Sequence, residues 1–208
     1  RSGPRGRRLD LALDAAARGL PDRDRRWLHE AVYGTVRLRG RIDHLLDLHL
    51  KKGLKSLSPS VLDLFRLGTY QLLYMDSVPS YAALSQTVDH VRSVAGEGGA
   101  RLANGVLRAL DREGADEARF PAFDEDPEGY LRTWGSHPAW MIRRWLELWG
   151  PAEVRRLVEW NNVPPPSFFR PLGDSLDEAH SALLAQGVSV SRVEGEVPCL
   201  QVLDGTNP

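Results

Sequence analysis

Apolar residues recur at helical spacing through the first 112 residues, and this periodicity constrains the fold more than any other feature of the chain. Glycine and proline interrupt the pattern between segments that are long enough to form helices. We therefore predict helices with short connections over residues 9–18, 22–52 with a break near Gly40, 58–73, 80–95 and 99–112. Such a succession of amphipathic helices is typical of an all-α bundle.

Individual residues sharpen this prediction at the helix ends and faces. We expect Asp22 to cap the second helix and Ser58 the third. Gly68 lies within an apolar stripe and predicts the close approach of another helix. The inward positions predicted for the last two helices are Tyr81, Leu84, Val88, Val91 and Ala95, and then Ala103, Val106, Leu107 and Leu110.

The second half of the chain changes character twice. Residues 113–127 are acidic and aperiodic, which indicates a linker, and helices are predicted over 138–149 and 151–160. Trp145 and Trp149 lie four residues apart in the first of these, so we expect both in the core. After three consecutive prolines the spacing indicates a strand over 167–170, a helix over 175–186 and strands over 188–191 and 200–203.

The predicted fold class is therefore mainly α. Residues 1–112 form an all-α helical bundle, residues 113–162 form a linker and a helical pair, and residues 163–208 form a small α+β (β-α-β) segment. A sheet of two or three strands with one helix is small for an independent domain, so this segment is expected to rest on a neighbour.

The composition argues against several classes of function. No apolar run approaches the ~20 residues that span a bilayer, so no membrane partner is expected. Cys199 is the only cysteine, which fits a reducing cytoplasm, and no neighbour activates it as a nucleophile. The histidines lack metal-ligand spacing, and no glycine-rich loop joins a strand to a helix. We predict a cytoplasmic chain without catalytic, cofactor-binding or metal-ligating residues.

The net charge of −1 conceals a strong asymmetry. Residues 1–112 hold 19 Lys and Arg against 12 Asp and Glu, a net of +7, whereas residues 113–208 hold 8 against 16, a net of −8. A basic half can attract phosphate backbones, although two solvated surfaces of different composition would give the same numbers.

Three groups of residues are candidates for contact with RNA. They are the basic N-terminus with Arg5, Arg7 and Arg8, the second helix with Arg26 and Arg37, and one face of the helix near residue 100 with Arg101, Asn104 and Arg108. Each has a simpler explanation: a solvated tail, an ion pair between Arg26 and Glu30, and an ordinary polar helix face.

Several ordered motifs resemble one known family. They are Ala31-Val32-Tyr33-Gly34-Thr35-Val36-Arg37 with Ile42-Asp43, Arg66-Leu67-Gly68-Thr69-Tyr70-Gln71-Leu72-Leu73, Val78-Pro79, Asn104-Gly105-Val106-Leu107-Arg108, Ser136-His137-Pro138-Ala139-Trp140, and Asn161-Asn162 with Pro164-Pro165. Together they resemble the NusB-like helical domain and the following segment of the Sun/RsmB family, which are bacterial ribosomal-RNA cytosine-C5 methyltransferases. The resemblance covers nearly the whole chain.

This resemblance implies an RNA-binding helical domain that positions small-subunit ribosomal RNA for a methyltransferase domain. It also implies S-adenosylmethionine as the cofactor of that domain, and the domain itself as a partner of this chain. The chain is expected to be a fragment that ends before it, and Cys199 matches neither of the family's cysteine motifs. Two alternatives stay open: a free-standing antitermination factor that binds RNA, and a protein–protein docking module.

Overall fold

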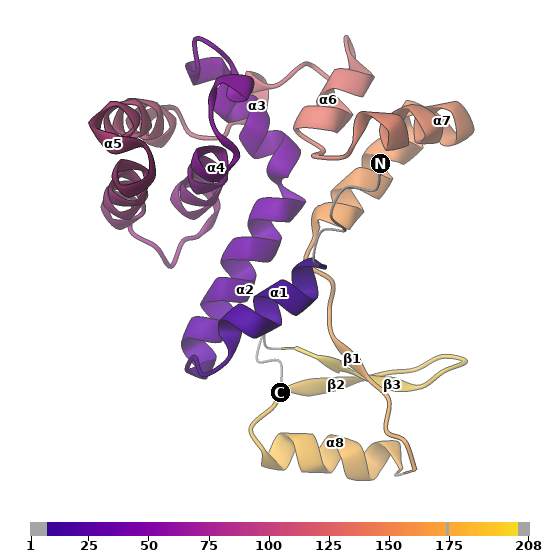
Figure 1. The fold of residues 1–208 in the computed structure, drawn as a ribbon. Helices are drawn as coiled ribbons and strands as arrows, with labels where there is room; N and C mark the ends of the chain where they lie inside the picture. Colours follow the sequence, from indigo (N-terminus) through magenta and orange to yellow (C-terminus); the bar gives the residue numbers. More distant parts are fainter. Residues whose placement is uncertain (1–7, 174, 204–208) are drawn as a thin grey trace, which may run out of the picture. The chain divides into compact units, whose positions relative to one another are not determined.

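The computed structural model describes residues 8–173 and 175–203. The chain divides into two compact units, and the boundary lies between residues 162 and 163. The first unit is helical and the second combines one helix with a small sheet (Figure 1). The mainly α fold class predicted from the periodicity is therefore confirmed. The finer boundary at residue 112 stays a prediction.

The first unit begins with a run of helices in the predicted order. They are α1 (Leu9–Ala17), α2 (Asp22–Arg37), α3 (Arg39–His49), the 3-10 turn η1 (Leu54–Ser56), α4 (Pro59–Tyr74) and α5 (Ser80–Glu113). Gly96 has a φ of 67° and breaks α5 into two halves, which are seen nearly end-on in Figure 1. The predicted stop at Gly96 is confirmed, because a left-handed backbone is open to glycine at little cost.

The core of this unit lies where α3, α4 and α5 meet. Ile42, Leu45, Phe65, Val91 and Leu110 belong to one cluster and are fully buried. Gly68 on α4 and Thr87 on α5 bring the two helices together, and the close approach was predicted for Gly68. A Cβ atom on Gly68 would lie 2.3 Å from Oγ1 of Thr87, so the two helices are in contact at this point.

The close approach of α4 and α5 places two of the predicted inward residues on the outside. Ala83 and Thr87 face inward with Val88 and Val91, whereas Tyr81 is 78% exposed and Ala95 is exposed. Small side chains allow the helices to pack closely, so Ala83 and Thr87 occupy the contact in preference to Tyr81, which lies two positions before Ala83.

The predicted starts of α2 and α4 lie at the right residues, but the predicted capping hydrogen bonds are not formed. α4 begins at Pro59 as expected, but the side chain of Ser58 makes no capping hydrogen bond. Asp22 was predicted wrongly as a cap: it is the first residue of α2, follows Pro21 and forms an ion pair with Arg25.

The rest of the first unit comprises η2 (Glu117–Arg119), α6 (Pro127–Thr133) and α7 (Ala139–Asn162), which is kinked at Gly150. Leu131, Ile142, Val154 and Val158 form a second buried cluster. Trp145 packs on this cluster, but Trp149 is 51% exposed, so the prediction that both tryptophans are core residues was wrong for Trp149. No helix within the described residues is both long and apolar enough to cross a membrane.

The second unit is an antiparallel sheet with one helix. Its elements are β1 (Phe168–Phe169), α8 (Leu176–Ala185), β2 (Val190–Val193) and β3 (Cys199–Val202), and the strand order is β1-β3-β2. Phe168 pairs with Gln201, and Val190 pairs with Val202. β2 begins two residues later than predicted.

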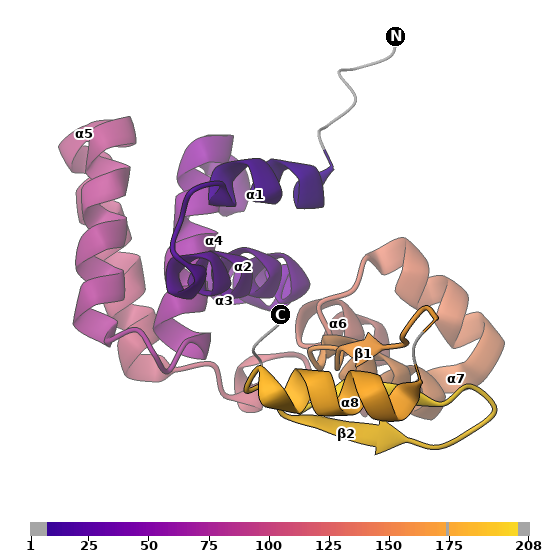
Figure 2. The same cartoon turned by 90° about the horizontal axis from the view of Figure 1, so that it is seen from below.

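One helix packs on this sheet and closes its small core. Figure 2 shows α8 lying along the sheet, and Leu176 and Leu183 pack against Val190 and Leu200. The capping box of Ser175 and Glu178 starts α8, and these hydrogen bonds to Ser175 lower the pKa of Glu178.

Candidate nucleic-acid interface

The outer face of α2 brings together two of the predicted arginines and a tyrosine. Ala31 and Gly34 are buried on the inner face of the helix. At 100° per residue, Arg26, Tyr33 and Arg37 fall within about 40° of one another, and they lie about 60–160° around the helix from Ala31 and Gly34. Arg26 and Tyr33 are exposed, and Arg37 is half-buried. We call these three residues the α2 stripe.

The ion pair that would explain Arg26 without RNA is not formed. The hydroxyl of Tyr70 on α4 donates a hydrogen bond of 2.8 Å to the carboxylate of Glu30. Burial, and then this hydrogen bond, raise the pKa of Tyr70 to about 12. Within the part of the chain that the structure describes, neither Arg26 nor Arg37 forms a salt bridge with a carboxylate.

A loop between α6 and α7 fixes the C-terminal end of α2. The hydroxyl of Ser136 accepts a hydrogen bond from Gly40 N and donates one to Arg37 O, both at 2.8 Å. The guanidinium of Arg41 donates to Trp134 O at 2.7 and 2.9 Å and lies 3.7 Å from the centroid of its ring. Burial lowers the pKa of Arg41. Arg41 is thus committed to packing, whereas the side chain of Arg37 stays available.

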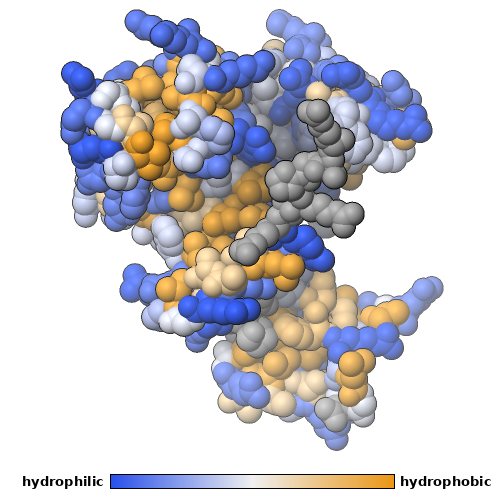
Figure 3. Space-filling model, viewed as in Figure 1, coloured by the Kyte–Doolittle hydropathy of each residue, from blue (hydrophilic) through white to orange (hydrophobic). Residues whose placement is uncertain are grey.

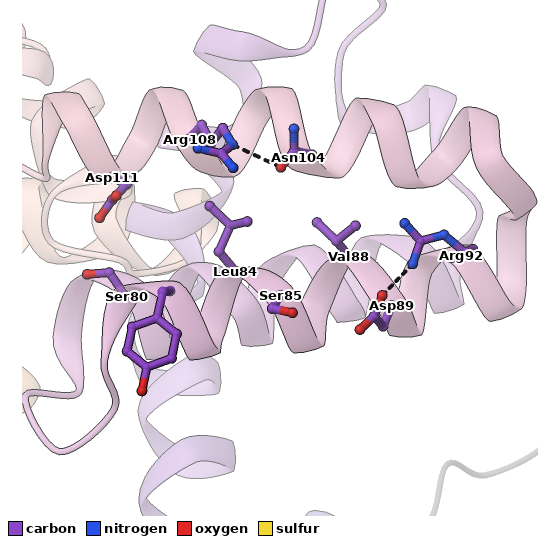
Figure 4. A pocket seen from close by; sticks show the side chains of 10 residues that line it. Ser80, Leu84, Ser85, Val88, Asp89, Arg92, Asn104, Arg108 and Asp111 are labelled. Atoms are coloured by element: carbon purple, nitrogen blue, oxygen red, sulfur yellow. Dashed lines mark hydrogen bonds and ion pairs between the residues drawn. The ribbon is translucent and has the colours of Figure 1, made fainter.

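The second predicted group lies beside a groove between the two halves of α5. This groove has a volume of about 750 Å³, with Leu84 and Val88 among its lining residues (Figure 4). Asn104 and Arg108 line it from the second half, and Nε of Arg108 donates to Oδ1 of Asn104 at 3.0 Å. Arg101 lies on the same helix and is exposed. The structure therefore places all three predicted residues on one half of α5.

The charges around this groove are mixed. Arg92 forms ion pairs with Asp89 and, at 2.7 Å, with Glu97. Asp111 also lines the groove, and Tyr81 stands exposed at it. Carboxylates repel phosphate, so these side chains make the groove a less favourable place for an RNA backbone. Figure 3 colours the surface by hydropathy, and on the face in view hydrophilic surface alternates with hydrophobic patches.

The N-terminal candidates fall mostly outside the described residues, where Arg5 and Arg7 lie. Arg8 is exposed and forms an ion pair of 2.5 Å with Asp10. Tyr33 was not among the candidates predicted from the sequence. Its signal was available, since an aromatic residue lies seven positions after one arginine and four before the other on a polar helix face.

No cluster of three metal-ligating side chains occurs within residues 8–173 and 175–203. Cys199 is a free, half-buried thiol on β3. The fold and these surfaces define a helical-bundle protein with exposed arginines on its outer helices.

The chain belongs to the NusB family, whose family model matches residues 4–112. It is 31% identical over 191 residues to a probable ribosomal RNA small subunit methyltransferase B of Bacillus subtilis, a match that covers 90% of this chain and 41% of the relative. The enzyme of the same name from Klebsiella pneumoniae is 30% identical over 166 residues, which cover 80% of this chain and 36% of the relative. A putative methyltransferase of Mycobacterium tuberculosis is 35% identical over 150 residues, which cover 69% and 32%.

The chain is therefore similar to the N-terminal part of ribosomal RNA small subunit methyltransferase B, and it spans about two fifths or less of the length of these relatives. The family resemblance drawn from the motifs is confirmed.

Proposed function

We propose that this chain is the RNA-binding part of a ribosomal RNA cytosine-C5 methyltransferase and that it positions small-subunit RNA for methyl transfer. The observation that carries the proposal is the α2 stripe, because its two arginines are free of carboxylate partners on a NusB-family bundle. The names of the relatives support the substrate class.

The chemistry is assigned to the part of the relatives that the chain does not match. S-adenosylmethionine would bind there, and that methyltransferase domain would be a partner of this chain. We also propose that the protein acts in the cytoplasm, where ribosomal RNA of bacteria is modified. No membrane partner is proposed.

The test compares two surfaces by charge reversal. The variants are Arg26→Glu/Arg37→Glu on α2 and Arg101→Glu/Arg108→Glu on α5. A control, Arg144→Glu/Arg156→Glu on α7, changes the net charge equally and breaks only exposed ion pairs, which contribute little to stability. Binding to small-subunit RNA fragments is measured by fluorescence anisotropy.

We expect the α2 variant to lose about tenfold or more in affinity, because repulsion replaces two phosphate contacts. The control should bind like the wild type, apart from a small effect of net charge. Equal affinity for all four proteins would contradict the proposal.

The docking alternative keeps one specific observation in its favour, namely the mixed charges of the α5 groove. If Arg101→Glu/Arg108→Glu leaves RNA affinity unchanged while Arg26→Glu/Arg37→Glu lowers it, the groove is assigned to contact with protein instead.

A further inference from the structure

Tyr33 lies between the two arginines of the α2 stripe and is a ready surface for a nucleobase. With a rise of 1.5 Å per residue, Arg26 lies about 10 Å from Tyr33 along the helix, and Arg37 about 6 Å on the other side. Long arginine side chains can therefore reach the phosphates on either side of a base that rests on the tyrosine ring.

The ring of Tyr33 is held in place from within its own helix. His29 and Tyr33 form a T-shaped ring pair, with the ring centroids 5.7 Å apart and the planes at 67°. Nε2 of His29 is buried and has no hydrogen-bond partner among the described residues, so the imidazole serves here as a packing surface. Because this contact already holds the ring of Tyr33, which is 36% exposed, little conformational entropy is lost when a base stacks on it.

We infer that the α2 stripe binds unpaired nucleotides of RNA, with a base stacked on Tyr33 and flanking phosphates bound by Arg26 and Arg37. This inference rests on the proposed function and specifies its substrate. In an A-form duplex the bases are stacked on each other, and the grooves present mainly riboses, phosphates and base edges. A tyrosine on a convex helix surface reaches a base face only where the strand is single.

The α5 groove does not offer the same combination. Tyr81 is more exposed than Tyr33, and Arg108 forms no salt bridge among the described residues. However, Asp111 also lines this groove, and Arg92 is neutralised by Asp89 and Glu97. The α2 stripe has an exposed ring and two cations without carboxylate partners in the described part of the chain.

The experiment measures how two probes bind to three proteins. The probes are a single-stranded oligouridylate that carries one 2-aminopurine, and an RNA duplex of the same length. The proteins are the wild type, Tyr33→Leu, which keeps apolar bulk without a π face, and Tyr33→Phe, which keeps the ring. Circular dichroism checks that each variant is folded.

Tyr33→Leu should bind the single strand about fivefold or more weakly than the wild type, and the duplex equally well. Tyr33→Phe should match the wild type on both probes. The fluorescence of 2-aminopurine should be quenched by the wild type and Tyr33→Phe but not by Tyr33→Leu.

Unchanged binding and quenching in a folded Tyr33→Leu would overturn the stacking role while leaving the RNA-binding function intact. A wild type that binds neither probe at low salt would overturn the proposed function itself, and the inference with it.

Discussion

Replacing Gly34 by alanine tests how α2 is held against α4. A Cβ atom at Gly34 would lie 1.9 Å from both Cζ and Oη of Tyr70, so the ring must move by at least about 1 Å in a close-packed interior. Such a shift breaks the hydrogen bond from Tyr70 to Glu30. The α2 stripe lies on the same helix, about 60–100° around the axis from Gly34.

Three contributions set the size of the effect. Overpacking costs about 1–3 kcal/mol. Loss of a hydrogen bond to a charged acceptor costs roughly 1.5 kcal/mol, at the low end of its range because Glu30 is exposed and can be rehydrated. The higher helix propensity of alanine returns about 1 kcal/mol. We expect Gly34→Ala to lower the free energy of unfolding by about 1.5–3.5 kcal/mol, measured by urea denaturation.

Gly105 provides a matched control on α5. It is exposed, and a Cβ atom there would meet nothing within 4 Å. Gly105→Ala should therefore stabilise the protein by about 0.5–1 kcal/mol. In a Tyr70→Leu background the cost of Gly34→Ala should largely vanish, because the clashing ring is gone. If Gly34→Ala is as stable as Gly105→Ala, the reasoning about this contact is refuted.

Three further changes test other contacts. Arg41→Lys should cost about 1–3 kcal/mol in urea denaturation, because lysine lacks the planar fork that bonds Trp134 O and stacks on its ring; equal stability would refute this. Ser136→Ala should cost a similar amount, since Gly40 N loses its acceptor; a change within error would show that the bond contributes nothing. Tyr70 has its pKa raised from 10.0 to about 12, so its stabilisation is complete below pH 10 and is lost as the pH rises to 12, by about 2–3 kcal/mol. Tyr70→Phe should lack this decline, and an identical alkaline profile would contradict it.

Local signals in the sequence predicted the helices and many of their ends. The break at Gly96 is predicted from the sequence, because glycine readily adopts the left-handed backbone that ends a helix. Gly68 predicted a close helix contact, but its partner, Thr87, could not be read from the chain. The error at Tyr81 follows from this, because Leu84 and Val88 fit two neighbouring stripes and only the position of α4 decides between them.

Contacts between residues far apart in sequence were beyond reach. Spacing alone paired Glu30 with Arg26, four residues away, but its hydrogen bond is to Tyr70, forty residues away. In the same way, nothing in the sequence near Arg41 indicates that its side chain packs on Trp134, which lies more than ninety residues away. Rules based on sequence spacing identify possible partners within one helix. They cannot predict that a residue from another part of the chain will bind the side chain instead.

The most direct test of the central claim is the dependence of RNA affinity on salt. Each phosphate contact releases counterions, so the logarithm of the affinity should fall linearly with the logarithm of the salt concentration. Replacing Arg26 and Arg37 by glutamine should reduce the magnitude of that slope by about 1 for each arginine removed. If the wild type binds RNA with no dependence on salt, or if both proteins give the same slope, these arginines do not bind phosphate and the account of the α2 stripe is wrong.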